Sequence, residues 1–428
     1  MNANVDFDTL YRHAHAGDPE AQFQLGRHYA GHQEWNRARR IWRNAAERGH
    51  PGALTELGLL QLFGIGIPPE PTLAVGVLER AEAAGSGEAA CQLALLGWSD
   101  YYVRFDAAAM AARLRAAALA DFAPALRASA LLLARTDGAD PALGDACLAR
   151  AASLGDTVSQ YLWGRRLRGR GDAAGDAWLA EAARRGLPRA RELLGDADSP
   201  PPQLVPAITS LPALELPCPA PAAIEVHSID PLVETWEDVF SAEECEFMIA
   251  LGEPFLQRSV TIPGDEIPGN PTTLVEHEHR TSSDHSFYTF QEDFALRWLQ
   301  WRMVARLGVP LANAEHLDLL RYRPGQEYRP HRDYLPPSAP GNSARPDQPG
   351  QRVHTIFAYL ADVQAGGETD FPLLGVRVVP RTGHVVHFVN LTADGQPDPR
   401  TLHAGMSVIA GVKWLGTLWT RERRMRDY

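Results

Sequence analysis

The residues best suited to chemistry lie at the end of the segment RYRPGQEYRPHRD, which runs from Arg321 to Asp333. An imidazole and a carboxylate stand two positions apart there, at His331 and Asp333. On a β-strand this spacing points both side chains to the same face, where together they can bind one metal ion. A third ligand is available at His403, in the segment TLHAGMSVIAGVKW, if a second strand brings it beside the first two.

Two histidines and one carboxylate make a particular kind of metal site. On one face of an octahedron they leave three positions open, which is the facial triad of non-haem Fe(II) oxygenases. A histidine and an aspartate two apart also occur by chance in many chains of this length. The site gains support from Lys413, ten positions after His403, because it is the only lysine in the chain. A chain that uses arginine everywhere else has kept one lysine where the site needs a cationic anchor.

Four ordered blocks in the second half of the chain resemble the catalytic domain of prolyl 4-hydroxylases, a branch of the 2-oxoglutarate- and Fe(II)-dependent dioxygenases. They are YRPGQEYRPHRD from Tyr322, RVHTIFAYLADVQAGGETDFP from Arg352, VVPRTGHVVHF from Val378 and LHAGMSVIAGVKW from Leu402. The chain departs from the family pattern at Ser407, where the family usually has proline, and at His384, where it usually has aspartate. Neither position is a metal ligand.

The resemblance implies a full set of cofactors. His331, Asp333 and His403 would bind Fe(II), with 2-oxoglutarate and O2 as co-substrates and ascorbate as an additional reductant. The distal carboxylate of 2-oxoglutarate would bind Lys413 in a mostly apolar pocket, where a charge pair is strong if both members are held and hydrogen-bonded.

The resemblance also implies further side chains around the cavity. Tyr322 would lie in the cavity, and Tyr359 or Thr355 on the next strand would hydrogen-bond the co-substrate. The segment EHRTSSDHSFY, from Glu278 to Tyr288, resembles the lid that closes over the substrate, although a solvated polar turn is a close alternative. The residues expected on the substrate side are Arg280, Thr281, Ser282, Tyr328 and Trp419.

Length and charge exclude several classes of protein. A chain of 428 residues is too long for one ordinary core and predicts two or more domains. The net charge of -12 disfavours a general nucleic-acid binder, which needs a basic face for phosphates.

The four cysteines form no C-x-x-C pair, so they predict neither a zinc site nor a disulfide framework. With no apolar leader and no membrane-length stretch, we expect a cytoplasmic protein without membrane partners, and the arginine bias suggests a GC-rich bacterium.

A short motif of glycine, three residues and a small residue recurs through the first two hundred residues. It starts at Gly17, Gly49, Gly85 and Gly186, with degenerate copies at Asp121 and Gly155, so successive starts are 32, 36, 36, 34 and 31 residues apart. This period is typical of a solenoid of helical hairpins, with the glycine as a left-handed cap. The pattern resembles Sel1-like repeats, which are related to tetratricopeptide repeats and usually bind proteins or peptides. A spacer or an oligomerisation arm would show the same pattern.

Composition divides the chain at a proline-rich stretch. We assign residues 1–198 to an all-α helical-hairpin repeat solenoid, 199–222 to a linker, and 223–428 to the dioxygenase domain. In the last part, the segment from Ile224 reads as a strand and a helix capped by Ser241 and Glu244, and QEDFALRWLQWRMVARLG as a second helix. Short apolar runs after Leu317 predict strands, consistent with the double-stranded β-helix, or jelly roll, that the resemblance implies.

These observations predict a dioxygenase that hydroxylates a prolyl residue in a peptide or protein and releases succinate and CO2, with the repeats recruiting the substrate or a partner. A close alternative keeps the chemistry but acts on a free amino acid or a small peptide natural product. Another alternative is a repeat-based scaffold whose oxygenase domain is inactive. An open groove would favour a polypeptide substrate, and a closed pocket would favour a small molecule.

Overall fold

The computed structural model describes residues 7–194, 202, 204–259, 279–336, 339, 341–342, 345 and 347–427. The chain forms two compact units. The first contains the residues up to Leu154 together with Val205–Leu216, and the second contains residues 155–204 and 217–427. The domain boundaries at 198 and 222 remain a prediction from composition.

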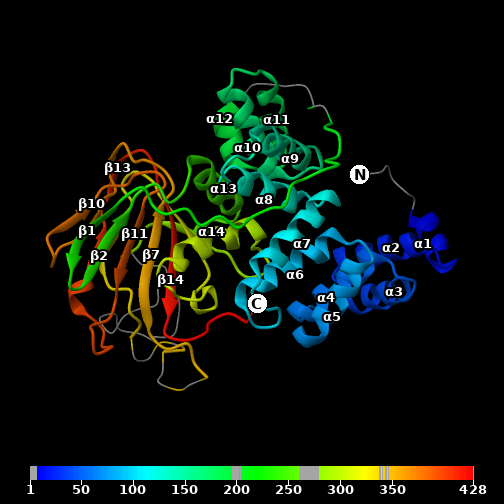
Figure 1. Cartoon of the computed structure of the whole chain (residues 1–428), viewed down its shortest axis with the longest axis horizontal. Helices are drawn as coiled ribbons and strands as arrows, with labels where there is room; N and C mark the ends of the chain where they lie inside the picture. The colour runs from blue at the N-terminus through cyan, green and yellow to red at the C-terminus, as the bar shows by residue number, and fades with distance from the viewer. Residues whose placement is uncertain are drawn as a thin grey trace. The chain divides into compact units, whose positions relative to one another are not determined.

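Helical hairpins build the first unit. Its helices are α1 (Phe7–His15), α2 (Pro19–Gly31), α3 (Trp35–Glu47), α4 (Pro51–Phe63), α5 (Pro71–Ala83), α6 (Gly87–Leu96), η1 (Gly97–Ser99), α7 (Ala107–Leu119), α8 (Ala123–Leu133) and α9 (Pro141–Ser153). Each α-helix contacts the next in chain order (Figure 1). The motif glycines Gly17, Gly49 and Gly85 have φ angles of 91°, 78° and 92°. This is the left-handed conformation that the repeat pattern predicts, so the helical-hairpin fold is confirmed.

The proline-rich segment Val205–Leu216 belongs to the first unit, and its residues form no helix or strand. Nε of Arg115 donates a hydrogen bond to the carbonyl of Leu211 over 2.7 Å. Nη1 of Arg150 donates to the carbonyl of Val205 over 2.6 Å. These backbone carbonyls belong to no helix or strand, and the arginine side chains supply their hydrogen-bond donors.

The second unit begins with three helices that continue the repeat pattern. They are α10 (Thr157–Gly169), α11 (Ala174–Arg184) and α12 (Pro188–Leu194), and they belong to the same unit as α13 (Ala242–Gly252). Nη2 of Arg166 lies 2.6 Å from a carboxylate oxygen of Glu243, and Nη2 of Arg189 lies 2.7 Å from one of Glu246. The hydroxyl of Tyr161 also donates to Glu246 over 2.7 Å. These charge-assisted bonds join the last repeats to a helix of the β-sheet region.

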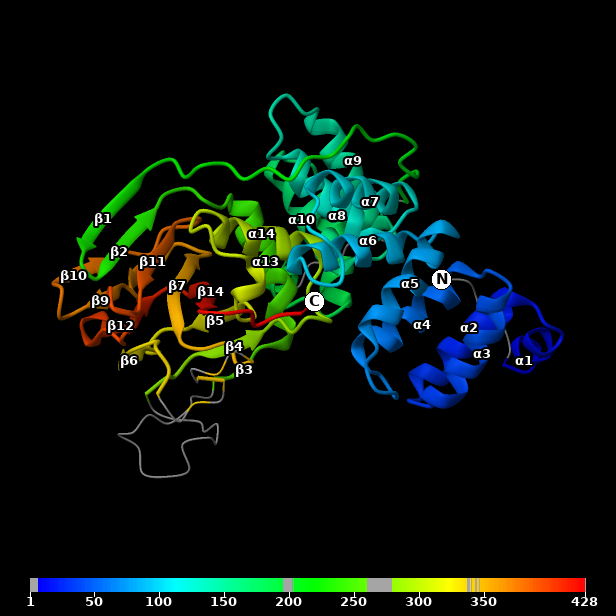
Figure 2. The same cartoon turned by 60° about the horizontal axis from the view of Figure 1, so that its bottom comes forward.

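Antiparallel strands form the rest of the second unit. An eight-stranded sheet has the order β1 (Ile224–Ile229), β2 (Leu232–Trp236), β11 (Val385–Val389), β7 (Arg352–Tyr359), β14 (Lys413–Arg421), β5 (Asp318–Tyr322), β4 (Ser283–Ser286) and β3 (Gln257–Arg258). A four-stranded sheet has the order β10 (Val376–Val378), β9 (Thr369–Phe371), β12 (His403–Gly405) and β6 (Tyr328–His331) (Figure 2). A third pair joins β13 (Val408–Ala410) to β8 (Ala365–Gly366). The short helices are η2 (Glu253–Phe255), η3 (Leu311–Asn313) and η4 (Pro399–Thr401).

The two larger sheets share an apolar core. Buried Leu320 and Phe357 of the large sheet belong to the same cluster as buried Phe371 and Val378 of the smaller sheet. Alternate residues of each strand point into this cluster, as period-two patterning requires. The predicted jelly roll is therefore confirmed.

The helices of this unit follow the sequence pattern closely. The predicted capping box at Ser241 and Glu244 is present at the start of α13. The helix α14 (Phe294–Ala305) lies within the second predicted helical segment and begins after Asp293, which caps it. The segment from Ile224, expected to form one strand, instead forms the hairpin β1–β2. Among the described helices, none has the length and apolarity needed to cross a membrane.

Candidate metal and co-substrate site

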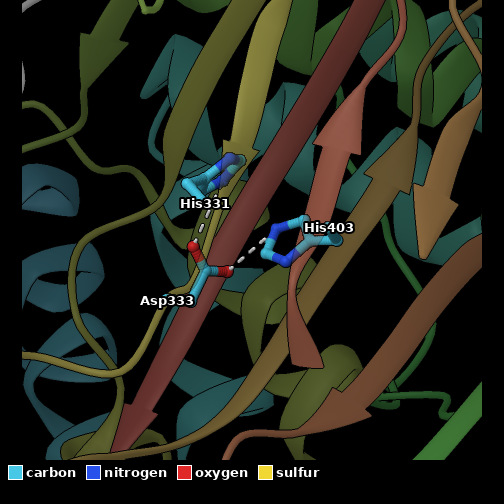
Figure 3. Close-up of side chains that lie close together, drawn as sticks. All are labelled: His331, Asp333 and His403. Atoms are coloured by element: carbon cyan, nitrogen blue, oxygen red, sulfur yellow. Dashed lines mark ion pairs between the residues drawn. The ribbon is translucent and has the colours of Figure 1, made fainter. Parts of the chain in front are cut away.

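The predicted triad comes together on the smaller sheet. His331 ends β6, His403 begins β12, and the two residues are paired in the antiparallel register. Nε2 of His331 lies 3.6 Å from Oδ1 of Asp333, and Nε2 of His403 lies 3.7 Å from Oδ2 (Figure 3). The three ligand atoms all lie within 4.8 Å of one another. Ligand atoms at right angles around a metal with bonds of about 2.1 Å lie about 3 Å apart, so small shifts would complete a facial site.

Backbone carbonyls fix the tautomer of both histidines. Nδ1 of His331 lies 2.8 Å from the carbonyl oxygen of Arg329, and Nδ1 of His403 lies 3.0 Å from that of Thr401. A carbonyl only accepts, so Nδ1 carries the proton and the lone pair of Nε2 faces the triad. Burial, and then the neighbouring His403, lower the pKa of His331 and keep its imidazole neutral. The two backbone bonds thus orient both rings so that Nε2 is the atom available to a metal ion.

The carboxylate of Asp333 is held from the large sheet. Oγ1 of Thr355 donates to Oδ2 of Asp333 over 2.8 Å, and Nδ2 of Asn390 donates to Oγ1 of Thr355 over 2.9 Å. Burial alone would raise the pKa of Asp333, but the adjacent His403 and His331 outweigh it and hold the pKa below its usual range. The aspartate is therefore ionised, as a ligand must be.

Lys413 is a buried amine to which the described residues offer no paired anion. Its side chain is 2% exposed, and Nζ lies 5.6 Å from the ring centroids of both Tyr322 and Tyr359. Burial lowers the pKa of Lys413 to about 7, against a weaker opposing effect of Glu368. Within the described ranges, Nζ makes no ion pair. Beside it, a Cβ added at Gly405 would lie 3.7 Å from Nζ, so the glycine leaves room at the amine. A bound carboxylate would compensate this buried charge.

The other residues expected around 2-oxoglutarate lie in different places. Tyr322 is opposite Lys413 on β5, and Tyr359 on β7 hydrogen-bonds Oγ1 of Thr369 over 2.8 Å. Thr355 contacts the carboxylate of Asp333 rather than the surroundings of the lysine. Two of the three expected residues thus flank the cationic end of the site, and the third lies at its metal end.

The predicted R-T-S signature packs against β6. Arg280 is buried, with its guanidinium carbon 5.3 Å from the ring centroid of Tyr328, and its Nε donates to Oγ of Ser282 over 3.1 Å. Thr281 donates to the carbonyl of Glu327 over 3.0 Å. These contacts anchor the signature beside the strand that carries the first histidine.

The remaining substrate-side residues lie close to the triad. Tyr328 stacks on His331, with ring centroids 3.4 Å apart. Trp419 lies on β14 opposite Thr355, and its ring centroid is 4.1 Å from the guanidinium carbon of Arg352. Glu278, the first residue of the predicted lid, lies outside the described residues.

Sequence reasoning did not identify Arg352 as a site residue. Its guanidinium pairs with both carboxylate oxygens of Glu315 at 2.7 Å, and its Nη1 lies 3.3 Å from the carbonyl of Asp333. If side chains alternated strictly along β7, Arg352 would point to the face opposite to Thr355. A β-bulge shifts the register there, and Arg352 pairs with Arg421 instead.

One cavity of about 1000 Å³ contains both ends of the site. His331, Asp333, His403 and Lys413 all line it. A metal ion at the triad and an anion at the lysine would therefore share one solvent-accessible space. The donor set and the buried amine fit Fe(II) together with a dicarboxylic co-substrate.

Comparison with known proteins agrees with this chemistry. Residues 317–421 match the model of the 2OG-Fe(II) oxygenase superfamily. Prolyl 4-hydroxylase 1 of Arabidopsis thaliana is 34% identical over 213 residues, which cover 46% of this chain and 72% of the plant protein. A viral collagen prolyl hydroxylase from Paramecium Bursaria Chlorella virus-1 is 25% identical, with a TM-score of 0.34, over 44% of this chain and 95% of that structure. A Sel1 repeat protein from Oxalobacter formigenes is 20% identical, with a TM-score of 0.35, over 45% of this chain and 80% of that one.

The assignment of this chain to a family rests on the plant protein, because the identity extends over 72% of its length. The two-histidine, one-carboxylate cluster lies inside the matched segment. The chain belongs to the 2OG-Fe(II) oxygenase superfamily as a prolyl 4-hydroxylase-like dioxygenase.

Proposed function

We propose that the protein hydroxylates a prolyl residue in a peptide or protein and converts 2-oxoglutarate to succinate and CO2. The observation that carries this proposal is the shared cavity: the buried Lys413, which makes no ion pair with any described residue, and the triad of His331, Asp333 and His403 line one space of about 1000 Å³. The identity with Prolyl 4-hydroxylase 1 supports proline as the target.

The residues have distinct roles in this proposal. His331, Asp333 and His403 bind Fe(II), and Lys413 binds the distal carboxylate of 2-oxoglutarate. Bound iron, with O2, supplies the oxidative decarboxylation and the insertion of oxygen into a C–H bond, and ascorbate keeps the metal reduced.

Other side chains prepare the cavity. Tyr322 and Tyr359 form apolar walls around the amine, so the charge pair is shielded from water. Thr355 orients the carboxylate ligand. Tyr328 and Trp419 lie beside the triad, where they can position the target residue against the metal.

The repeat array has a separate role in the proposal. Solenoids of helical hairpins present extended surfaces to protein partners. We assign the array to recruitment of the polypeptide substrate or of a partner that carries it.

Succinate formation by purified, iron-loaded protein tests the reaction. We expect turnover that depends on Fe(II), increases with proline-rich peptides and is lost in His331→Ala. Lys413→Met should bind 2-oxoglutarate at least about tenfold more weakly while still binding the metal. Mass spectrometry of the peptide should show a gain of one oxygen on proline.

Two outcomes contradict the proposal in different ways. Succinate formation that responds to free amino acids and not to peptides would replace the polypeptide substrate with a small molecule. A folded protein that binds neither Mn(II) nor 2-oxoglutarate would indicate that its oxygenase site is inactive.

A further inference from the structure

Arginine side chains gather on the solvent side of α3, the second helix of the first repeat. The helix carries four arginines in the seven residues from Arg37 to Arg43, and a single acidic residue, Glu47. Ala38 and Trp42 are buried on its other side, where they belong to the apolar core of the repeats. At about 100° per residue, the four arginines point away from these core residues. We call Arg37, Arg39, Arg40 and Arg43 the basic face.

Most charges of the basic face have no partner within the protein. Arg37 pairs with Glu34, with Nη1 2.6 Å from a carboxylate oxygen, and their side chains are 60% and 41% exposed. The other three arginines of the face form no ion pair with any residue that the structure describes. The helix in the same position of a later repeat, α11, differs in this respect, because Arg184 and Arg185 both pair with Glu181. The first repeat therefore presents cationic groups that the chain itself does not neutralise.

The helix α3 is held firmly against its neighbour α2. Nε1 of Trp42 donates to the carbonyl of Phe23 on α2 over 3.1 Å, and Trp42 is 1% exposed. A Cβ added at Gly26 would lie 2.2 Å from the same indole nitrogen, so this glycine allows the two helices to approach closely. The arginines thus extend from an ordered backbone, which lowers the entropy cost of binding.

A cavity of about 360 Å³ lies at the start of the same helix. Trp35 and Arg37 of α3 line it, together with Gly66 of the loop that precedes α5. A Cβ added at Gly66 would lie 2.7 Å from Cβ of Trp35, so the loop packs tightly against the first residue of the helix. The cavity has room for one large side chain of a bound segment, directly beside the first arginine of the basic face.

Charge and length indicate which ligand suits this surface. Guanidinium groups bind carboxylates and phosphates through paired hydrogen bonds. The four arginines span about 9 Å along the helix axis, which is the length of about three extended residues. A long polyanion would continue onto the next repeat, where residues 51–98 contain five glutamates and one arginine. The surface therefore complements a short acidic segment better than a nucleic acid.

We propose that the basic face binds an acidic segment of a polypeptide partner, and that an adjoining apolar side chain of this segment occupies the cavity beside Trp35. This inference rests on the recruitment role proposed for the repeats and names the chemistry of the partner. It concerns binding alone, so it does not depend on metal, 2-oxoglutarate or turnover. The repeats then recruit proteins in which clustered aspartates and glutamates adjoin a large apolar residue.

Anisotropy of fluorescein-labelled probes tests the binding with the full, metal-free chain. The acidic probe is a peptide with one tryptophan followed by four alternating aspartates and glutamates. A neutral probe has asparagine and glutamine in place of the acids, a third has serine in place of tryptophan, and a thymidine oligonucleotide has the charge of the acidic probe. We expect the neutral probe to bind at least about tenfold more weakly than the acidic probe, and the serine probe to bind several-fold more weakly.

Removing two charges of the basic face should weaken binding of the acidic probe. We expect Arg40→Gln/Arg43→Gln to lose about tenfold in affinity, since both side chains are exposed and the helix core is unchanged. The matched control Arg80→Gln/Arg104→Gln removes the same charge from exposed positions of the same unit. It should bind the acidic probe like the unaltered chain.

Glu34 gives a test in the opposite direction. Its carboxylate occupies Arg37, so a bound carboxylate has to compete with it. We expect Glu34→Gln to bind the acidic probe more tightly than the unaltered chain does, and the neutral probe equally well.

Each outcome decides a different statement. Equal binding of the acidic and neutral probes, or unchanged affinity in Arg40→Gln/Arg43→Gln, overturns the inference. Tighter binding of the oligonucleotide than of the acidic probe would make the partner a nucleic acid and overturn it as well. Equal binding of the serine probe removes the cavity from the binding surface. Charge-dependent binding by a chain that forms no succinate supports the basic face and contradicts the proposed reaction, whereas succinate formation without binding of the acidic probe does the reverse.

Discussion

The hydroxyl of Thr355 directs its proton to Oδ2 of Asp333, 2.8 Å away. The direction is set by Asn390, whose amide donates into the same hydroxyl over 2.9 Å. A hydroxyl has one proton, so the bond from Asn390 leaves that proton free for the carboxylate. The large sheet thereby fixes a metal ligand that extends from the end of a strand in the small sheet.

Removing this hydroxyl should weaken metal binding. We expect Thr355→Val to reduce the affinity for Mn(II) by roughly tenfold, because partners of metal ligands typically contribute a factor of this size, and Thr355→Ser to restore it. Calorimetric titration of Mn(II) into the protein measures the effect. A Thr355→Val variant with normal Mn(II) affinity but weakened binding of the co-substrate would instead place Thr355 at 2-oxoglutarate, as the sequence suggested.

Binding of 2-oxoglutarate should depend on pH through Lys413. The pKa of this lysine in the ligand-free protein is lowered to about 7 by burial, and a bound carboxylate stabilises the protonated amine. Binding above pH 7 therefore takes up a proton, so the affinity should fall by about tenfold for each pH unit above 7. Calorimetry in buffers of different ionisation enthalpy would detect the proton. Affinity that stays constant from pH 7 to 9 would contradict this assignment.

The buried carboxylate of Glu292 should stabilise the second unit in a pH-dependent way. Burial alone would raise its pKa, but Arg426 and Arg297 outweigh burial and lower the pKa to about 2. A depressed pKa means that the stabilisation is complete above the unfolded value of about 4.5 and is lost as the pH falls towards 2. We expect Glu292→Gln to cost roughly 3 kcal/mol at neutral pH, with the difference from the unaltered chain shrinking below pH 4.5.

Urea unfolding at pH 7, 4.5 and 3 measures this change. Asp347→Asn is the matched control, because its pair with Arg345 is at the surface, with side chains 59% and 74% exposed. Surface pairs of this kind contribute little, so the control should unfold like the parent chain. A Glu292→Gln variant with the same stability at pH 7 would show that the buried charges are not coupled to folding.

The last repeat should stabilise the catalytic unit through Arg189. Its guanidinium pairs with Glu246 and lies 5.6 Å from the ring centroid of Trp414, which is next to Lys413 on β14. We expect Arg189→Met to lower the free energy of unfolding of the second unit by roughly 2 kcal/mol, because hydrogen bonds to a charged group are lost. Hydrogen exchange in α13 should accelerate as well.

Arg184→Met gives a comparison on the neighbouring helix, since the Arg184 side chain is 55% exposed. It should leave both the unfolding free energy and the exchange rates of α13 unchanged. Equal behaviour of the two variants would mean that the repeat merely adjoins the sheet region without supporting it.

Local patterns were sufficient to predict the triad and the repeats. The spacing of His331 and Asp333 and the family segment around His403 placed all three ligands, because ligand type and strand geometry are short-range properties. The glycines of the repeated motif likewise predicted where the backbone between two helices is left-handed.

Long-range relationships could not be predicted in the same way. Arg189 and Glu246 are 57 residues apart, and no periodicity of the sequence links them. Arg352 lines the cavity although strict alternation from Thr355 would place it on the opposite face of β7, because a β-bulge shifts the register there. Neither the ion pair nor the bulge has a signal in a single sequence.

The sole lysine has a practical consequence for chemical labelling. At neutral pH an amine with a pKa near 7 is substantially unprotonated, and an unprotonated amine is the nucleophilic form. Apart from the α-amino group, an amine-selective acylating reagent can modify only Lys413 in this chain. The proposed role of Lys413 therefore predicts that added 2-oxoglutarate lowers the extent of acylation at this residue, which intact-mass spectrometry would measure.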